Sequence, residues 1–163
     1  MKICIGTILT ILFMVGTSCE QAVNVEKEKE AILAVLHAEG AAAIAKDMEG
    51  VFALHVKDEL ETRLEMGLYG YNKYEGWEEV EKLLSDFMGG EGEIGGVEDL
   101  KNTKENVVMK VTGNTAWLTC DNILEWTTDG VKDGYTNLQI VFFEKIKGEW
   151  KISFAAYYGK PKP

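Results

Sequence analysis

Hydrophobic residues recur every three or four positions between Glu28 and Asp47, which is the spacing of one face of an α-helix. The positions on this face are Leu33, Leu36, Gly40, Ala43 or Ile44, Met48 and Val51. The middle of the segment, residues 40–45, is rich in alanine and lacks bulky side chains. We therefore expect a long helix whose middle allows a sheet or a second helix to approach its backbone closely.

Two further helices are predicted in the first half of the chain. A short one runs through Val51, Phe52, Leu54 and His55. An apolar stripe at helical spacing follows Gly76 and ends at Gly89 and Gly90; its members are Trp77, Val80, Leu83, Leu84 and Phe87. Residues 60–71 alternate weakly between apolar and polar side chains, which indicates one or two short strands before this helix.

The pattern changes to alternation after Val97, and turn-forming pairs divide the remainder into strands. These pairs are Gly113-Asn114, Asp129-Gly130, Asp133-Gly134 and Lys147-Gly148. We predict four antiparallel strands. Helices followed by a run of strands indicate an α+β fold, with the helices laid across one face of a curved sheet.

Two segments of this predicted meander carry a family resemblance. They are Gly113-Asn114-Thr115-Ala116-Trp117, and Phe142-Phe143-Glu144-Lys145 continuing through Gly148-Glu149-Trp150-Lys151-Ile152. Together with the order of helices and strands, they resemble the nuclear-transport-factor-2-like superfamily, in its SnoaL-like branch, over residues 28–158. The resemblance implies a cone-like curved antiparallel sheet wrapped around the long N-terminal helix with two shorter helices. It also implies a pocket between sheet and helix and a homodimer formed through the outer face of the sheet.

The N-terminal residues predict export. One lysine precedes an apolar run, Ile3–Val15, which is shorter than the roughly 20 residues that a membrane-spanning helix needs. Small residues and Cys19 follow, and this arrangement resembles a bacterial lipobox. We expect a signal peptide at residues 1–18, lipidation of Cys19, a tether at 19–27 and a domain at 28–160, held at the bacterial cell envelope by the lipid anchor. Secretion with cleavage nearby and no lipid is the alternative.

Composition narrows the possible partners. The chain has 27 acidic and 17 basic residues, a formal net charge of −10, so nucleic acid is not an expected partner. The two histidines and the internal Cys120 do not form a zinc-binding spacing, and the glycine-rich run at 89–96 lacks the strand and helix that a phosphate-binding loop requires. We expect no metal and no cofactor.

Two residues are candidates for proton transfer, the chemistry that enzymes of this superfamily use. His37 lies at the edge of the buried face of the first helix, and Asp121 lies within a strand. Alternation places Asp121 and Asn122 on opposite faces of the sheet. We favour the register in which Asn122 faces the pocket, because a buried carboxylate without a cation is costly; the opposite register would place Asp121 inside. His55 is expected at the surface.

Many SnoaL-like relatives place pocket histidines four and six residues after the tryptophan of Trp-Lys-Ile, where this chain has Phe154 and Ala156. We therefore expect an apolar, aromatic pocket with no clear catalytic set. The predicted ligand-binding residues are Tyr69, Tyr71, Tyr74, Trp77, Asn122, Phe142, Phe154 and Tyr158, with Tyr157 as the alternative to Tyr158. The favoured function is an envelope-anchored, homodimeric module that binds a small apolar or aromatic molecule or serves in assembly. The alternative is a cofactor-free isomerase or dehydratase that uses a pocket Asp, His or Tyr.

Overall fold

The computed structural model describes residues 24–89 and 97–159. The expected signal peptide, Cys19 and most of the expected tether lie outside the described residues, as does most of the glycine-rich run. Within the described ranges, no helix is both long enough and apolar enough to cross a membrane.

Three helices lie in the first half of the chain: α1 (Val25–Ile44), α2 (Met48–Ala53) and α3 (Trp77–Gly89). The Asn24 side chain accepts a hydrogen bond from Lys27 N at 3.3 Å, so α1 begins inside the segment expected to be a tether. It also ends earlier than expected, because Lys46 adopts a positive φ of 56° and Asp47 caps α2 by accepting from Gly50 N at 2.9 Å. The α3 helix lies where the pattern predicts it. The α2 helix begins before Val51 and ends at Ala53, so Leu54 and His55, which were predicted in this helix, follow it.

Six strands form one curved sheet in the order β2-β1-β6-β5-β4-β3. They are β1 (Thr62–Gly67), β2 (Gly70–Glu75), β3 (Glu98–Thr112), β4 (Thr115–Thr128), β5 (Val131–Ile146) and β6 (Glu149–Gly159). Neighbouring strands are antiparallel except β1 and β6, which are parallel. The predicted α+β class and the four-stranded antiparallel meander are confirmed.

One predicted turn is wrong. Asp133 and Gly134 lie within β5, and the β4–β5 hairpin turns at Asp129-Gly130. Gly134 is needed for a different reason: a Cβ atom there would lie 2.5 Å from the carbonyl oxygen of Leu124 on the paired strand. The glycine therefore marks close contact between two backbones, not a reversal of the chain.

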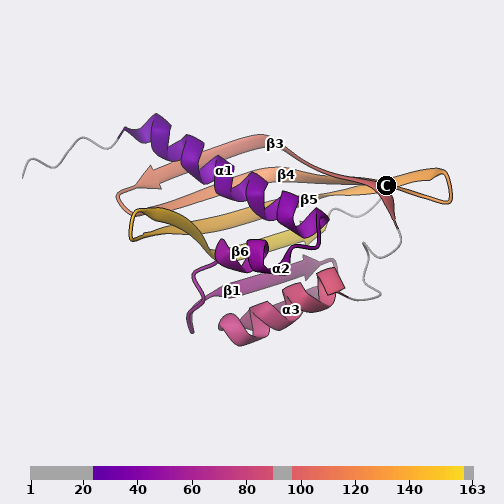
Figure 1. Cartoon of the computed structure of the whole chain (residues 1–163), viewed down its shortest axis with the longest axis horizontal. Coiled ribbons are helices and arrows are strands. Elements are labelled where there is room, and N and C mark those ends of the chain that lie inside the picture. Colours follow the sequence, from indigo (N-terminus) through magenta and orange to yellow (C-terminus); the bar gives the residue numbers. More distant parts are fainter. Residues whose placement is uncertain (1–23, 90–96, 160–163) are drawn as a thin grey trace, which may run out of the picture.

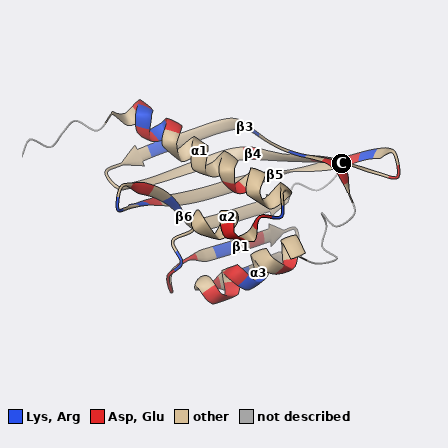
Figure 2. Cartoon of the chain, in the orientation of Figure 1, with Lys and Arg blue, Asp and Glu red and all other residues tan. Residues whose placement is uncertain are grey.

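The helices cover one face of the sheet, as Figure 1 shows, and leave the other face uncovered. Figure 2 shows acidic residues along α3.

The main core lies between α1 and the middle strands. Its fully buried members include Ile32, Leu36, Leu118, Val141 and Phe143. A smaller cluster, centred on Val51, Val80, Leu84 and Met88, joins α2 to α3. We call the covered face concave and the other convex.

The first turn of α1 is fastened to the β5–β6 hairpin. Lys145 Nζ and Trp150 Nε1 both donate to the Glu28 carboxylate at 2.7 Å. These hydrogen bonds lower the pKa of Glu28, and the one from Lys145 has the larger effect.

Further along α1, Gly40 lies against Asn102 of β3, where a Cβ atom would stand 3.6 Å from the Asn102 amide carbon. The helix is thus held at its first turn, and the close approach of β3 at Gly40 is what the small residues there predict.

Candidate functional site

A cavity of about 640 Å³ lies between α1, α3 and the concave face of the sheet. Apolar side chains from α1, α3, β3 and β4 form much of its wall: Ala43, Ile44, Leu83, Phe87, Leu100 and Leu124. Polar and charged side chains gather on the sheet side and on α1: Glu39, Arg63, Asn102, Lys104, Asn122, Asn137 and Tyr157. The cavity is therefore less apolar than the sequence suggests.

A hydrogen-bonded network forms the polar end of the cavity. Lys104 Nζ donates to Asn122 Oδ1 at 2.6 Å and to Gln139 Oε1 at 2.7 Å. Asn122 Nδ2 donates to Asn137 Oδ1 at 3.0 Å, and Gln139 Nε2 donates to the Tyr157 hydroxyl at 2.9 Å. We call these five residues the amide network. Strand register explains their meeting, because Lys104, Asn122 and Asn137 pair directly across β3, β4 and β5.

Burial perturbs two members of this network. Burial lowers the pKa of Lys104, and the positive charge of Arg63 acts in the same direction. Burial also raises the pKa of Tyr157 well above its usual value, and the negative charge of Glu39 adds to this effect. At neutral pH Tyr157 is therefore a protonated hydroxyl that can donate a hydrogen bond.

Arg63 is the second cationic group of the cavity. Its side chain is 12% exposed, and its guanidinium stacks on the Tyr157 ring at 4.5 Å. Its ion pair with Glu65 is loose, with 3.9 Å between Nε and Oε1. Among the described residues, no group forms a hydrogen bond with Arg63 Nε or Nη1, although both atoms are buried. Buried guanidinium donors without acceptors are uncommon and point to a binding role.

Neither proposed proton carrier lies in the cavity. His37 is exposed on the outer side of α1. Asp121 lies on the convex face, where it accepts a hydrogen bond from Asn106 Nδ2 at 2.8 Å. The structure has the favoured register, in which Asn122 lines the cavity and Asp121 points away from it. Whether Asn122 contacts a ligand stays a prediction.

The other residues predicted to bind a ligand do not line the cavity. Tyr69 and Tyr71 project from the β1–β2 hairpin and are exposed, while Tyr74 and Trp77 pack against the α2–α3 cluster. Tyr158 pairs with Leu138 on the convex face of the sheet. In its place Tyr157, the alternative, lines the cavity. The predicted group Tyr69, Tyr71, Tyr74 and Trp77 therefore does not line this cavity.

Phe142 and Phe154 also lie on the convex face, where their rings meet edge to face with centroids 5.4 Å apart. The cause is a bulge in β6: Phe142 pairs with Phe154 and Phe143 pairs with Ile152, so Ser153 is an extra residue. This shifts the alternation by one position. Consequently Phe154 and Ala156, expected at positions where relatives carry pocket histidines, face outward in this chain.

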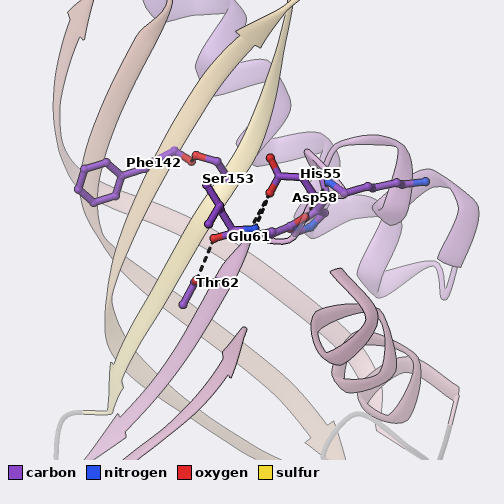
Figure 3. Close-up of polar contacts among 8 residues, drawn as sticks. His55, Asp58, Glu61, Thr62, Phe142 and Ser153 are labelled. Atoms are coloured by element: carbon purple, nitrogen blue, oxygen red, sulfur yellow. Dashed lines mark hydrogen bonds and ion pairs between the residues drawn. The ribbon is translucent and has the colours of Figure 1, made fainter. Parts of the chain in front are cut away.

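His55 is buried, contrary to its expected place at the surface. It is 5% exposed, and its Nδ1 is hydrogen-bonded to the Glu61 carboxylate. The second Glu61 oxygen accepts from Lys57 N at 2.9 Å, and Asp58 Oδ1 accepts from Glu61 N at 2.9 Å. Figure 3 shows His55, Asp58 and Glu61 gathered on one side of the strands, with the Phe142 ring pointing away on the other.

The burial of His55 follows from backbone pairing that the sequence does not reveal. Ile152 N donates to Leu54 O at 2.8 Å, and Val56 N donates to Ile152 O at 2.9 Å, so the segment after α2 lies alongside β6. His55 does not line the cavity. We assign the His55–Glu61 pair to holding the segment between α2 and β1 in place.

Sequence reasoning missed six residues of the polar end: Glu39, Arg63, Asn102, Lys104, Asn137 and Gln139. A usable signal was present for three of them. Gln139 and Asn137 occupy alternate positions of one strand and so face the same way, toward Asn122 on the next strand, and Lys104 is on the same face of β3. Within the described ranges, no group of three or more His, Cys, Asp or Glu side chains could hold a metal ion.

Comparisons with solved structures place the architecture in a known class. The chain has the NTF2-like, cystatin-like fold. An NTF2-like protein with a cystatin-like fold from Novosphingobium aromaticivorans matches with a TM-score of 0.65 and 14% identity, covering 85% of this chain and 86% of that one. No protein-family model matches the chain, and no curated protein is significantly similar to it.

Two further structural neighbours differ widely in what their names describe. One is a candidate dehydratase of the NTF2-like family from Streptomyces avermitilis, with a TM-score of 0.67, 16% identity, and coverage of 84% of this chain and 99% of that one. Another is the association domain of CaMKII from C. elegans, with a TM-score of 0.64, 17% identity, and coverage of 81% and 95%. The shared fold alone therefore does not decide between catalysis, binding and assembly.

Proposed function

We propose that this protein is a small-molecule-binding module of the SnoaL-like type, and that its ligand occupies the cavity between α1, α3 and the sheet. The cavity carries the proposal. Its volume of about 640 Å³ lies within the range of about 300–1,000 Å³ that is usual for ligand sites. Apolar walls with a few convergent polar groups at one end are also typical of such sites, since the walls supply affinity and the polar end supplies orientation.

A neutral fluorescent probe tests this proposal. N-phenyl-1-naphthylamine brightens when it leaves water for an apolar site, and we expect saturable binding at one probe per chain. Ala43→Trp places a large ring in the cavity and should abolish binding; Ile44→Trp at the rim provides a second, more exposed variant. Ala34→Trp, at an exposed position of the same helix, is the control. Equal probe binding by all four proteins would overturn the proposal.

A homodimer formed through the convex face is part of the proposal. Phe142 and Trp117 pair on this face and are 45% and 36% exposed, and Val108 on β3 is also exposed. Exposed apolar side chains that lie together on an uncovered sheet are typical of a protein–protein interface. Sedimentation equilibrium at micromolar concentration should give twice the chain mass, and a monomer would contradict this part.

We also propose that the chain is exported and anchored at the cell envelope through Cys19, on the strength of the N-terminal sequence pattern. Mass spectrometry of the protein from its own host should find a lipid-modified chain that begins at Cys19. A mature chain without lipid would leave the binding proposal intact and refute the anchor.

One observation favours a second function, cofactor-free proton transfer of the isomerase or dehydratase type. Glu39 lines the cavity at 8% exposure, and it shares that space with the Tyr157 hydroxyl. A carboxylate base and a hydroxyl donor are the two groups that such chemistry needs. If this function holds, Glu39→Gln abolishes turnover of a bound carbonyl compound while N-phenyl-1-naphthylamine binding persists. Unchanged turnover would exclude Glu39 as the base.

A further inference from the structure

Hydrogen-bond directions fix the orientation of the amide network. A lysine ammonium group can only donate, so Asn122 and Gln139 must both present their oxygens to Lys104. Their NH2 groups then point onward, to Asn137 Oδ1 and the Tyr157 hydroxyl. Each receiving group accepts a hydrogen bond, and each lines the cavity.

The network therefore ends in donors. Asn137 has used its oxygen as an acceptor and retains its NH2 group, while Tyr157 has accepted at its oxygen and retains its O–H proton. Burial raises the pKa of Tyr157, which keeps this proton in place at neutral pH. Arg63, which stacks on Tyr157, adds a guanidinium that likewise can only donate. The three groups present donors at the polar end of the cavity.

The charges of the cavity also favour a ligand that carries hydrogen-bond acceptors. Lys104 and Arg63 are cationic and largely buried, and among the described residues of the wall Glu39 is the one carboxylate with comparable burial. Glu65 and Asp86 also line the cavity, but their side chains are 42% and 67% exposed and water screens them. The buried groups thus carry one uncompensated positive charge.

We propose that the cavity recognises a monocarboxylate with an apolar or aromatic body, whose carboxylate lies against Arg63, Tyr157 and Asn137. This inference rests on the proposed binding function and names its ligand class. A carboxylate supplies two acceptor oxygens to these donors and neutralises the remaining charge. Glu39 limits the ligand to one negative charge, because a second charge in the same space would be repelled.

Paired probes test the assignment by isothermal titration calorimetry. Decanoate is compared with decanol, and 2-naphthylacetate with 2-(2-naphthyl)ethanol, so that each pair shares one body. We expect the wild-type protein to bind each acid at least about tenfold more tightly than its alcohol, the difference that one charge-assisted hydrogen bond supplies. 2-Naphthyl phosphate, with a second charge, should bind no more tightly than 2-naphthylacetate.

Single-residue variants then test which residues cause the preference for acids over alcohols. Arg63→Gln should lower the affinity for the acids at least about tenfold and leave the alcohols unchanged. Glu39→Gln should raise the affinity for the acids, because it removes a repelling charge. Tyr157→Phe removes a single donor and serves if Arg63→Gln does not fold. Lys101→Gln, on the convex face of β3 three residues before Lys104, is the matched control for loss of a positive charge.

The outcomes separate this inference from the function on which it rests. If acids and alcohols bind equally, or if the phosphate binds more than tenfold more tightly than the acid, the monocarboxylate assignment is wrong and the binding module stands. If neither these probes nor N-phenyl-1-naphthylamine bind, both proposals fail. Equal loss of acid binding in Arg63→Gln and Lys101→Gln would also overturn the assignment, since it would show only a general charge effect.

Discussion

The two faces of the sheet are built in opposite ways. The concave face, covered by helices, carries the amide network, with Asn122 and Gln139 only 2% and 1% exposed. The convex face, which no helix covers, carries Trp117 and Phe142 in partly exposed positions. The amide network beside the apolar core and the exposed rings on the other face both depart from the usual arrangement, in which apolar side chains are covered and polar ones are in water.

Both departures agree with the proposed ligand site and the proposed dimer. Buried amides are stable because they are hydrogen-bonded to Lys104 and to one another, and the donors that remain face a cavity. Apolar side chains on the uncovered face remain in water unless another surface packs on them. Under the proposed function, a ligand would complete the first face and a second copy would complete the other.

Adjacent phenylalanines provide the strongest test of the contrast. Phe143 faces the core at 1% exposure, and Phe142 faces outward at 45%. Phe143→Ala should lower the free energy of unfolding by about 3–5 kcal/mol, because it leaves a cavity in the core. Phe142→Ala should cost the monomer about 1 kcal/mol or less but should weaken the dimer. Urea unfolding of dilute protein and sedimentation equilibrium measure the two effects, and similar losses of stability in both variants would contradict the contrast.

Loss of the Lys104 ammonium should have the next largest effect. Lys104→Met leaves the buried oxygens of Asn122 and Gln139 without their donor, which should lower the free energy of unfolding by about 1–3 kcal/mol. Lys101→Met, on the same strand but exposed, should change it by no more than about 0.5 kcal/mol. Urea titrations of the two variants check this. Equal stabilities would mean that the network contributes nothing to folding.

Lys104 also predicts a pH dependence. Because burial lowers its pKa below the usual 10.5, the folded protein releases this proton at a lower pH than the unfolded chain. Between the two pKa values the unfolded chain holds more protons, so the free energy of unfolding rises with pH. Relative to Lys104→Met, the wild-type protein should gain stability as pH approaches 10.5. Urea unfolding of both proteins across this range tests it, and a constant difference would refute it.

The smallest effects on stability and probe binding are expected at the two residues that were predicted from the sequence to carry protons. His37→Ala alters an exposed residue, and Asp121→Asn alters a side chain on the convex face. Each should change the free energy of unfolding by no more than about 0.5 kcal/mol. Neither should alter N-phenyl-1-naphthylamine binding, because neither residue lines the cavity proposed to bind the probe. A tenfold loss of probe affinity in either variant would place the ligand site elsewhere.

Periodicity was sufficient for most of the fold. The helical stripe of α1, the apolar stripe of α3 and the alternation after Val97 each predict the element that the structure contains. Alternation in β4 also predicts that Asn122 and Asp121 face opposite ways. These features are local, since each depends on the geometry of one helix or one strand.

The candidate site depends on non-local features that the pattern does not contain. One extra residue, Ser153, reverses the faces of Phe154 and Ala156 relative to a regular strand. Arg63 reaches the cavity only because β1 pairs with β6, and His55 is buried because its segment pairs with Ile152. No local periodicity reports which distant strand lies alongside a segment, so these residues were misplaced or overlooked.

The parallel pairing of β1 with β6 has a consequence for folding kinetics. Thr62–Met66 pairs with Phe154–Tyr158, so an early strand depends on the last one for its place in the sheet. Contacts between segments so far apart in the chain form slowly. During synthesis the β1–β2 hairpin has no neighbouring strand in the sheet until the C-terminal strand emerges from the ribosome. The guanidinium of Arg63 reaches its position only then. Partly synthesised chains therefore lack the donor-rich end of the cavity.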